Sequence, residues 1–302
     1  MSKQTQWDAS RIADQKGRVI IVTGSTSGIG KETARVLAKK NGTVILAVRN
    51  VSKGQGVVSG IRHESPAADV SVRELDLTSL DSVQTLAGGI LRDYDRLDVL
   101  INNAGVMMCP YAKTSDGFEI QMGTNHLGHF ALTGRLMPLL ERTTGSRVVV
   151  LSSGAHAMAN IDLSDLNWEE RDYNTQRAYG DSKLANLYFG CELGRRLQQN
   201  GSNPRVIAAH PGWTATDLQR HSGLMRFMNV FLAQDVDMGA LPSLRAAYDP
   251  DAKSGDYFGP AGMFHIRGYP EAQNSSDLSH DQEIAERLWA VSEELTQVRF
   301  DL

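Results

Sequence analysis

Short apolar runs alternate with amphipathic segments along most of the chain. Residues 19–22 form a continuous β-branched apolar run, and further strand-like runs cover residues 43–50, 70–77, 97–105, 146–154 and 204–212. Between them, segments such as residues 79–94 and 130–143 carry apolar side chains at helical spacing. Unbroken apolar strands that alternate with helices are typical of a parallel sheet covered on both faces. The pattern therefore predicts an α/β fold, with a doubly wound parallel β-sheet and helices on both faces.

The composition is that of one globular domain. The 302 residues are 41% hydrophobic and 22% charged, which suits a chain that buries a full core. Because no repeat, low-complexity tract or linker interrupts the alternation, residues 17–302 are expected to form a single domain behind an N-terminal extension, residues 1–16. The final amphipathic segment, residues 281–298, is expected to pack on this domain.

Charge and cysteine content narrow the range of partners. A formal net charge of −4 and the lack of a Lys/Arg run argue against a nucleic-acid binder. Two cysteines, Cys109 and Cys191, are too few for a disulfide framework or a zinc cluster, and no metal site is expected. The N-terminus is polar and no run approaches the ~18 apolar residues of a spanning helix. The sequence therefore predicts a cytoplasmic protein without a stable membrane anchor.

The first apolar strand leads into a glycine-rich turn and then a helix. Gly24, Gly28 and Gly30 lie where the chain must turn tightly and allow a ligand close to the backbone. The free N–H groups at the start of the following helix favour an anion. Strand, glycine turn and helix together predict a site for a dinucleotide cofactor.

The second strand indicates which dinucleotide binds. An acidic residue at this point contacts the ribose 2′-hydroxyl of NAD(H), whereas an arginine accommodates the 2′-phosphate of NADP(H). Residues 43–48 contain no Asp or Glu, and Arg49 ends the strand. A guanidinium suits phosphate, so NADP(H) is favoured and NAD(H) is the alternative. A solvated surface arginine is the other interpretation of Arg49.

Tyr179 and Lys183 form a second candidate for chemistry. They are four residues apart in a segment with helical periodicity, so they project from the same face. An ammonium group favours the phenolate and lowers the pKa of a neighbouring phenol, which would make the pair a tuned acid/base. Helices also carry this pair by chance. Its setting favours chemistry, because Leu184, Leu187, Tyr188 and Cys191 are expected to form the buried stripe beside it.

Polar residues gather after several of the predicted strands. They are Asp76, Asn102, Ser152 with Ser153, and His210-Pro211-Gly212. Ligands of doubly wound sheets bind beyond the carboxyl ends of the strands. These residues are therefore expected to border the cofactor site.

Taken together, the motifs resemble the short-chain dehydrogenase/reductase superfamily, which has a Rossmann-type fold. They are "TGSTSGIG" at 23–30, "NNAG" at 102–105, "NHLG" at 125–128, "YGDSK" at 179–183 and "PGWTAT" at 211–216. The likeness is greatest to the branch that includes retinol dehydrogenases and many bacterial oxidoreductases. That branch has a longer interval between the active serine and tyrosine, as this chain has with its additional segment at residues 160–177.

The resemblance implies roles for four catalytic residues. Tyr179 would exchange a proton with the substrate oxygen, while Lys183 would lower its pKa and bind the nicotinamide ribose. Ser153, the second serine of the pair, would hold the substrate oxygen. Asn125 would hold a water in the proton relay, with a helix-entry hydrogen bond as its structural alternative. His126, His129 and His210 are interpreted as structural, and His156 as able to reach the cleft.

The predicted cofactor site combines the glycine turn with residues that the family pattern assigns. They are Gly24, Ser25, Thr26, Ser27, Gly28, Ile29 and Gly30 in the turn, Arg49, Asp76 and Leu77 at the adenosine end, Asn102, Ala104 and Gly105 beside the ribose, Pro211, Gly212 and Thr214 at the nicotinamide, and Tyr179 with Lys183.

The implied activity is an NADP(H)-dependent oxidoreductase that interconverts an apolar ketone or aldehyde and the corresponding alcohol. A non-catalytic NADP-binding sensor or scaffold of the same fold is the alternative. Residues 218–237 are strongly apolar and form either a substrate lid or a packing element. The sequence does not identify the substrate, and it does not show whether the protein is a monomer or a homo-oligomer.

Overall fold

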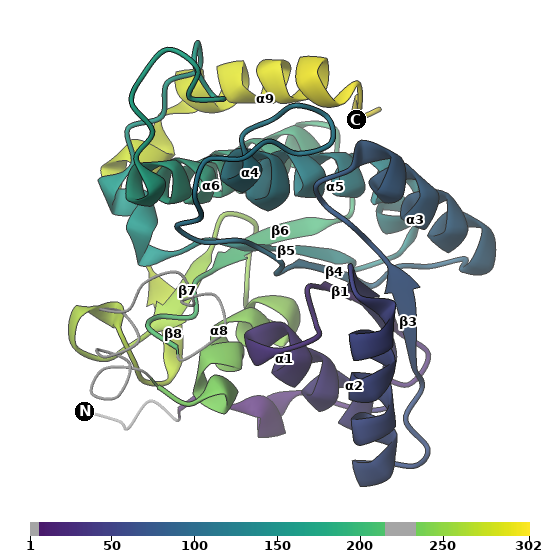
Figure 1. The fold of residues 1–302 in the computed structure, drawn as a ribbon. Helices are drawn as coiled ribbons and strands as arrows, with labels where there is room; N and C mark the ends of the chain where they lie inside the picture. Colours follow the sequence, from purple (N-terminus) through teal and green to yellow (C-terminus); the bar gives the residue numbers. More distant parts are fainter. Residues whose placement is uncertain (1–5, 215–233) are drawn as a thin grey trace.

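A computed structural model describes residues 6–214 and 234–302 and contains an eight-stranded sheet between two layers of helices (Figure 1). The strand order is β3-β2-β1-β4-β5-β6-β7-β8, and all neighbours are parallel except β7 and β8. The strands are β1 (Val19–Thr23), β2 (Thr43–Val48), β3 (Val70–Glu74), β4 (Val99–Asn102), β5 (Arg147–Leu151), β6 (Arg205–Ala209), β7 (Tyr257–Pro260) and β8 (Pro270–Gln273). The first six follow the order of a dinucleotide-binding sheet, so the predicted fold class is confirmed.

The helices divide between the two faces of the sheet (Figure 1). One face is covered by α1 (Gly28–Lys39), α2 (Val51–Glu64) and α8 (Val236–Tyr248). The other is covered by α3 (Leu80–Asp93), α4 (Ile120–Met122), α5 (Gly128–Arg142) and α6 (Thr175–Gln199), with α9 (Gln282–Thr296) packed on α6. A single π-helical turn, Gly123–Leu127, joins α4 to α5.

Alternation along β1 explains why both faces need a helical layer. Ile20 and Val22 enter the core under α1, α2 and α8, whereas Val19 and Ile21 enter the core under α3, α5 and α6. All four side chains are at most 7% exposed. Because successive side chains of a strand point to opposite faces, a strand that is buried on both faces must be apolar throughout.

Several local details differ from the sequence-based expectations. The strands β7 and β8 are not predicted by the apolar pattern, because they are short and contain glycine and proline. Cys191 is exposed rather than part of a buried stripe, because α6 buries Phe189, Glu192 and Leu193 around it and leaves this position outward. Within residues 6–16, Trp7 and Ile12 are buried in the core under α8.

Two sequence-based expectations, on membrane anchoring and on the apolar segment, can be compared with the described residues. In the described ranges, no helix is both long enough and apolar enough to cross a bilayer. Most of the predicted apolar segment, residues 218–233, lies outside the described residues, and residues 236–237 begin α8.

Candidate active site

A cleft of about 460 Å³ opens at the carboxyl ends of the strands, beside the point where β1 separates β2 from β4. This is where the strand order reverses, and ligands of doubly wound sheets bind there. The cleft is lined from the glycine turn at one side to Tyr179 and Lys183 at the other. The topology therefore brings the two chemical motifs of the sequence into one cavity.

The glycine turn is shaped by close backbone contacts. Gly24 has a φ of 67°, and a Cβ there would lie 2.7 Å from the Cα of Ala104. A Cβ at Gly30 would lie 2.7 Å from the carbonyl oxygen of Gly24. Helix α1 begins at Gly28, so its first N–H groups are without intrahelical partners. The tight turn thus ends at free N–H groups that can act as donors to a phosphate group.

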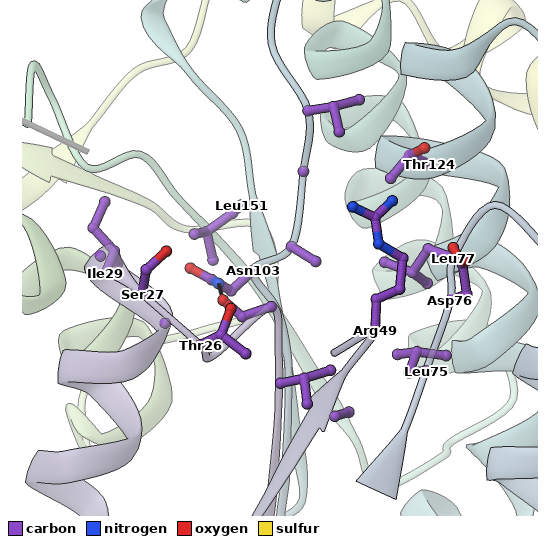
Figure 2. Close-up of a pocket in the computed structure, with 18 of the residues that line it drawn as sticks. Thr26, Ser27, Ile29, Arg49, Leu75, Asp76, Leu77, Asn103, Thr124 and Leu151 are labelled. Atoms are coloured by element: carbon purple, nitrogen blue, oxygen red, sulfur yellow. Dashed lines mark hydrogen bonds between the residues drawn. The ribbon is translucent and has the colours of Figure 1, made fainter. Parts of the chain in front are cut away.

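The other turn residues take different places. Thr26, Ser27 and Ile29 line the cleft, and Figure 2 shows them on the side of α1. Ser25 instead lies beneath the cleft, fully buried, and its hydroxyl donates to the carbonyl of Val22 at 3.1 Å. Its place suggests that it fixes the turn rather than contacting a ligand.

The opposite wall carries two cations and one carboxylate. Figure 2 shows Arg49 rising from the end of β2 on the side lined by Leu75, Asp76 and Leu77. Lys53, in the first turn of α2, also lines this end, and neither cation has an ion pair within the described parts of the chain. The Asp76 carboxylate accepts from the N–H of Thr78 at 3.0 Å and from its hydroxyl at 2.7 Å.

The floor of the cleft follows β4. Asn103, Ala104 and Gly105 line it, and the N–H groups of Asn103 and Ala104 each donate to Thr23 Oγ1 at 2.9 Å. Asn102 is buried below them, and its amide donates to Thr133 on α5 at 2.9 Å. Asn102 thus anchors the floor from beneath.

Tyr179 and Lys183 lie on α6 and are 7% and 5% exposed. The Lys183 ammonium is 5.7 Å from the centre of the Tyr179 ring and donates to the carbonyl of Leu151 at 3.3 Å. Burial lowers the pKa of Lys183 to about 8. Burial also raises the pKa of Tyr179 to about 12, and a hydrogen bond with Ser153 opposes this rise. The expected lowering of the phenol pKa by Lys183 is not seen in this arrangement.

The two serines after β5 have distinct contacts. Ser152 is buried, and its hydroxyl donates to the main-chain carbonyl of Lys183 at 2.8 Å. Ser153 is half-buried, accepts from the N–H of Ala155 at 3.2 Å, and hydrogen-bonds the Tyr179 phenol. The geometry therefore places Ser153, rather than Ser152, beside the hydroxyl that would do the chemistry.

Asn125 lies in the π-helical turn with its side chain fully engaged. Its amide donates to Val106 O at 3.0 Å and to Ser182 Oγ at 2.9 Å, and its Oδ1 accepts from Val106 N at 2.8 Å. These bonds tie the floor of the cleft to α6 beside Lys183. Single π turns are frequent at functional sites.

The predicted nicotinamide end is only partly described. Pro211 lines the cleft, and Gly212 has a φ of 63°. Thr214 is buried, and its hydroxyl donates to Pro211 O at 2.9 Å. The motif residues 215 and 216 lie outside the described residues.

Several residues of the cleft were missed by the sequence analysis. They are Ala47, Val48, Asn50, Lys53, Leu75, Thr78, Asn103, Val106, Ile120, Thr124 and Leu151. Lys53 could have been found, because it is a second cation only four residues after Arg49, at a predicted anion site. His156, thought able to reach the cleft, instead accepts from Ser276 N at 3.1 Å and contacts Ser153 O through Nδ1 at 2.6 Å.

The family now follows from comparison with known proteins. Residues 18–226 match the short chain dehydrogenase family. The chain belongs to this family. It is therefore an oxidoreductase acting on CH–OH and C=O groups, and the resemblance seen in the motifs is confirmed.

Relatives of this short-chain dehydrogenase cover nearly all of it. Human retinol dehydrogenase 13 is 44% identical over 290 residues, covering 92% of this chain and 84% of the human protein. A crystal structure of an uncharacterised protein from Mycobacterium paratuberculosis is 44% identical with a TM-score of 0.84, and covers 99% of this chain and 100% of its own. A Shigella flexneri short-chain dehydrogenase complexed with NADP is 28% identical with a TM-score of 0.61, covering 81% and 97%.

Proposed function

We propose that this short-chain dehydrogenase uses NADP(H) to interconvert an apolar ketone or aldehyde and the corresponding alcohol, with Tyr179 as the acid/base. The observation that carries the proposal is a buried phenol that shares one cleft with a glycine turn. A non-catalytic sensor would need the glycine turn but would have no use for a phenol, a serine hydroxyl and an ammonium at the other end.

The cleft fits a dinucleotide with a 2′-phosphate. At Gly24 the backbone packs so closely on Ala104 that a Cβ would lie 2.7 Å from its Cα, and this tight turn delivers the chain to the N-terminus of α1, where a pyrophosphate can meet free N–H groups. Arg49 and Lys53 supply two cations at the adenosine end, where NAD(H) sites have a carboxylate. The Shigella relative with NADP supports the same choice. NAD(H) is the weaker alternative because nothing acidic follows β2 directly.

Each catalytic side chain has a task in the reduction. A bound nicotinamide cofactor would supply the hydride. The phenol of Tyr179, with a pKa of about 12, is protonated at neutral pH and donates its proton to the substrate oxygen. Ser153 holds that oxygen where negative charge develops. The Lys183 ammonium lies 5.7 Å from the centre of the ring that carries the remaining phenolate, where its charge opposes that of the phenolate.

The substrate class is inferred from apolar surroundings and from relatives. Val106, Ile120 and Leu151 contribute apolar side chains to the lining of the cleft, and Leu151 contacts Lys183 through its carbonyl. Relatives named retinol dehydrogenases cover most of the chain. Apolar aldehydes and ketones are therefore the first compounds to test.

The test is oxidation of NADPH and of NADH by the purified protein against a panel of apolar aldehydes and ketones. We expect turnover with NADPH that is lost in Tyr179→Phe, while NADPH binding persists in both proteins. Binding of NADPH without turnover of any panel member would support the sensor instead. Faster turnover with NADH would contradict the role given to Arg49 and Lys53.

A further inference from the structure

His129 is a buried imidazole between two parts of the site, and the mechanism above does not use it. It lies on α5, one helical turn after Asn125, and is 2% exposed. Its Nε2 is 2.9 Å from Thr23 Oγ1, and its Nδ1 is 3.0 Å from the main-chain oxygen of Asn125. Both ring nitrogens therefore have partners, one in the cofactor half and one in the catalytic half.

The direction of these hydrogen bonds follows from the chemistry of the partners. Burial lowers the pKa of His129 to about 4, so the ring is neutral and has one donor and one acceptor. The carbonyl of Asn125 can only accept, which assigns the hydrogen to Nδ1. Nε2 must then accept from the Thr23 hydroxyl.

The Thr23 hydroxyl is saturated by this arrangement. Its two lone pairs accept the N–H groups of Asn103 and Ala104, each at 2.9 Å. Its own hydrogen points to His129, since the alternative acceptor, the carbonyl of Ile101, is farther away at 3.3 Å. A continuous chain of buried hydrogen bonds thus runs from the cleft floor, through Thr23 and His129, to Asn125.

This series of hydrogen bonds begins in the cofactor-binding half of the site and ends in the catalytic half. Thr23 ends β1 immediately before the glycine turn, and Asn125 binds Val106 on the floor and Ser182 on α6. A Cβ at Gly105 would lie 3.0 Å from Asn125 Oδ1 and 3.5 Å from Lys183 Nζ, so these two groups flank the same point of the floor. We propose that His129 is a positioning residue that couples the cofactor-binding floor to Asn125 and the catalytic helix.

The protein contains a matched control for His129, namely His126. It lies in the same π-helical turn as Asn125 and is 1% exposed, and burial lowers its pKa to about 3. Its Nε2 is 2.8 Å from Ser292 Oγ on α9, outside the cleft. A substitution at His126 therefore removes a similarly buried imidazole without interrupting the chain between Thr23 and Asn125.

The inference rests on the proposed function and is tested with four variants of the full chain. His129→Leu removes both hydrogen bonds. His129→Asn can place an amide donor where Nδ1 lies, while His129→Gln can place an oxygen acceptor where Nε2 lies. His126→Leu is the control. Thermal unfolding, NADPH binding by fluorescence, kcat, KM and the pH profile of kcat are measured for each.

We expect His129→Leu to lower kcat about 10²-fold, the effect of a small misplacement of catalytic groups. His129→Asn should recover kcat more than NADPH affinity, and His129→Gln the reverse. His126→Leu should reduce the melting temperature but leave kcat within about twofold of the unmodified protein. The pH profile should keep its shape in all variants, because His129 does not titrate in the working range.

Equal kcat in the His129→Asn and His129→Gln variants would overturn the proposal, even if His129→Leu fails to fold. An equal loss of kcat in His126→Leu and His129→Leu would also overturn it, because general destabilisation would then explain both. If the unmodified protein reduces no carbonyl compound, the proposed function fails by itself. NADPH affinity still tests the coupling in that case: it should be higher in His129→Gln than in His129→Asn, and equal affinities would contradict it.

Discussion

The two ends of the cleft are held in place by different means. The glycine turn is formed by backbone contacts and backbone donors: Gly24 packs closely on Ala104, and α1 begins with N–H groups that have no intrahelical partner. At the catalytic end, buried polar side chains fix the geometry: the Asn125 side chain accepts from the main-chain N–H of Val106 and donates to the Ser182 hydroxyl. The first end is sensitive to added atoms, and the second to lost polar groups.

Because of this difference, cofactor binding depends mainly on one end of the cleft and the reaction rate mainly on the other. A backbone site recognises the phosphates that all dinucleotides share, and only the cations at its rim discriminate between them. A side-chain site fixes the position and protonation of a few groups, on which the reaction rate depends. Substitutions at the glycine turn and its rim should therefore change the affinity or KM for the cofactor, and substitutions at the catalytic end should change kcat.

The largest expected effect is at the catalytic end. Tyr179→Phe removes the proton donor but keeps the ring in its buried place on α6, so kcat should fall about 10³-fold. Steady-state kinetics measures this loss of kcat, and NADPH titration shows separately whether the cofactor still binds. A variant that retained more than a tenth of the activity would show that another group donates the proton.

The next effect belongs to the backbone end. Gly24→Ala places a Cβ 2.7 Å from Ala104 Cα at a residue with positive φ, so NADPH affinity should fall about 10²-fold. Gly56→Ala, in open space on α2, is the matched control and should bind NADPH normally. Unchanged affinity in Gly24→Ala, measured by fluorescence titration, would place the pyrophosphate elsewhere.

A smaller effect is expected at the rim. Arg49→Gln and Lys53→Gln each remove a cation from the adenosine end, so KM for NADPH should rise about tenfold. KM for NADH, which lacks the 2′-phosphate, serves as the internal control and should stay unchanged. Parallel increases for both cofactors would indicate a structural effect rather than recognition of the phosphate.

The smallest effect is a pH dependence at the catalytic end. Since burial lowers the pKa of Lys183 to about 8, its stabilising charge is present below that pH and lost above it. The kcat for reduction should therefore fall about twofold between pH 7 and pH 8, and further above pH 8. Lys183→Arg keeps its charge and should flatten this profile. A flat profile in the unmodified protein would contradict the role of Lys183.

The buried strands of the sheet and the glycine turn could be predicted from the sequence. Runs such as residues 19–22 and 43–48 are apolar because β1 and β2 are buried on both faces, and this requirement is visible in the pattern. The glycine turn is equally visible, because close approach to Ala104 restricts the residue type at position 24.

The rest depends on contacts between distant segments. The bond between Thr23 and His129 joins residues on different elements, and no local pattern in the sequence indicates it. The π-helical turn at Gly123–Leu127 likewise has no periodicity of its own. The rise of the Tyr179 pKa was missed because spacing shows the proximity of Lys183 but not the depth of burial, which dominates. Polar networks in the core therefore need the structure.

The most direct test of the central claim follows the hydride itself. The protein is incubated with NADPH in which both hydrogens at the reactive carbon of the nicotinamide are replaced by deuterium, together with an apolar aldehyde or ketone, and the alcohol is analysed by mass spectrometry. The account predicts one deuterium in each alcohol molecule formed by the unmodified protein, and about 10³-fold slower formation of this alcohol with Tyr179→Phe. Bound NADPH that transfers no deuterium to any compound of a broad panel would contradict it.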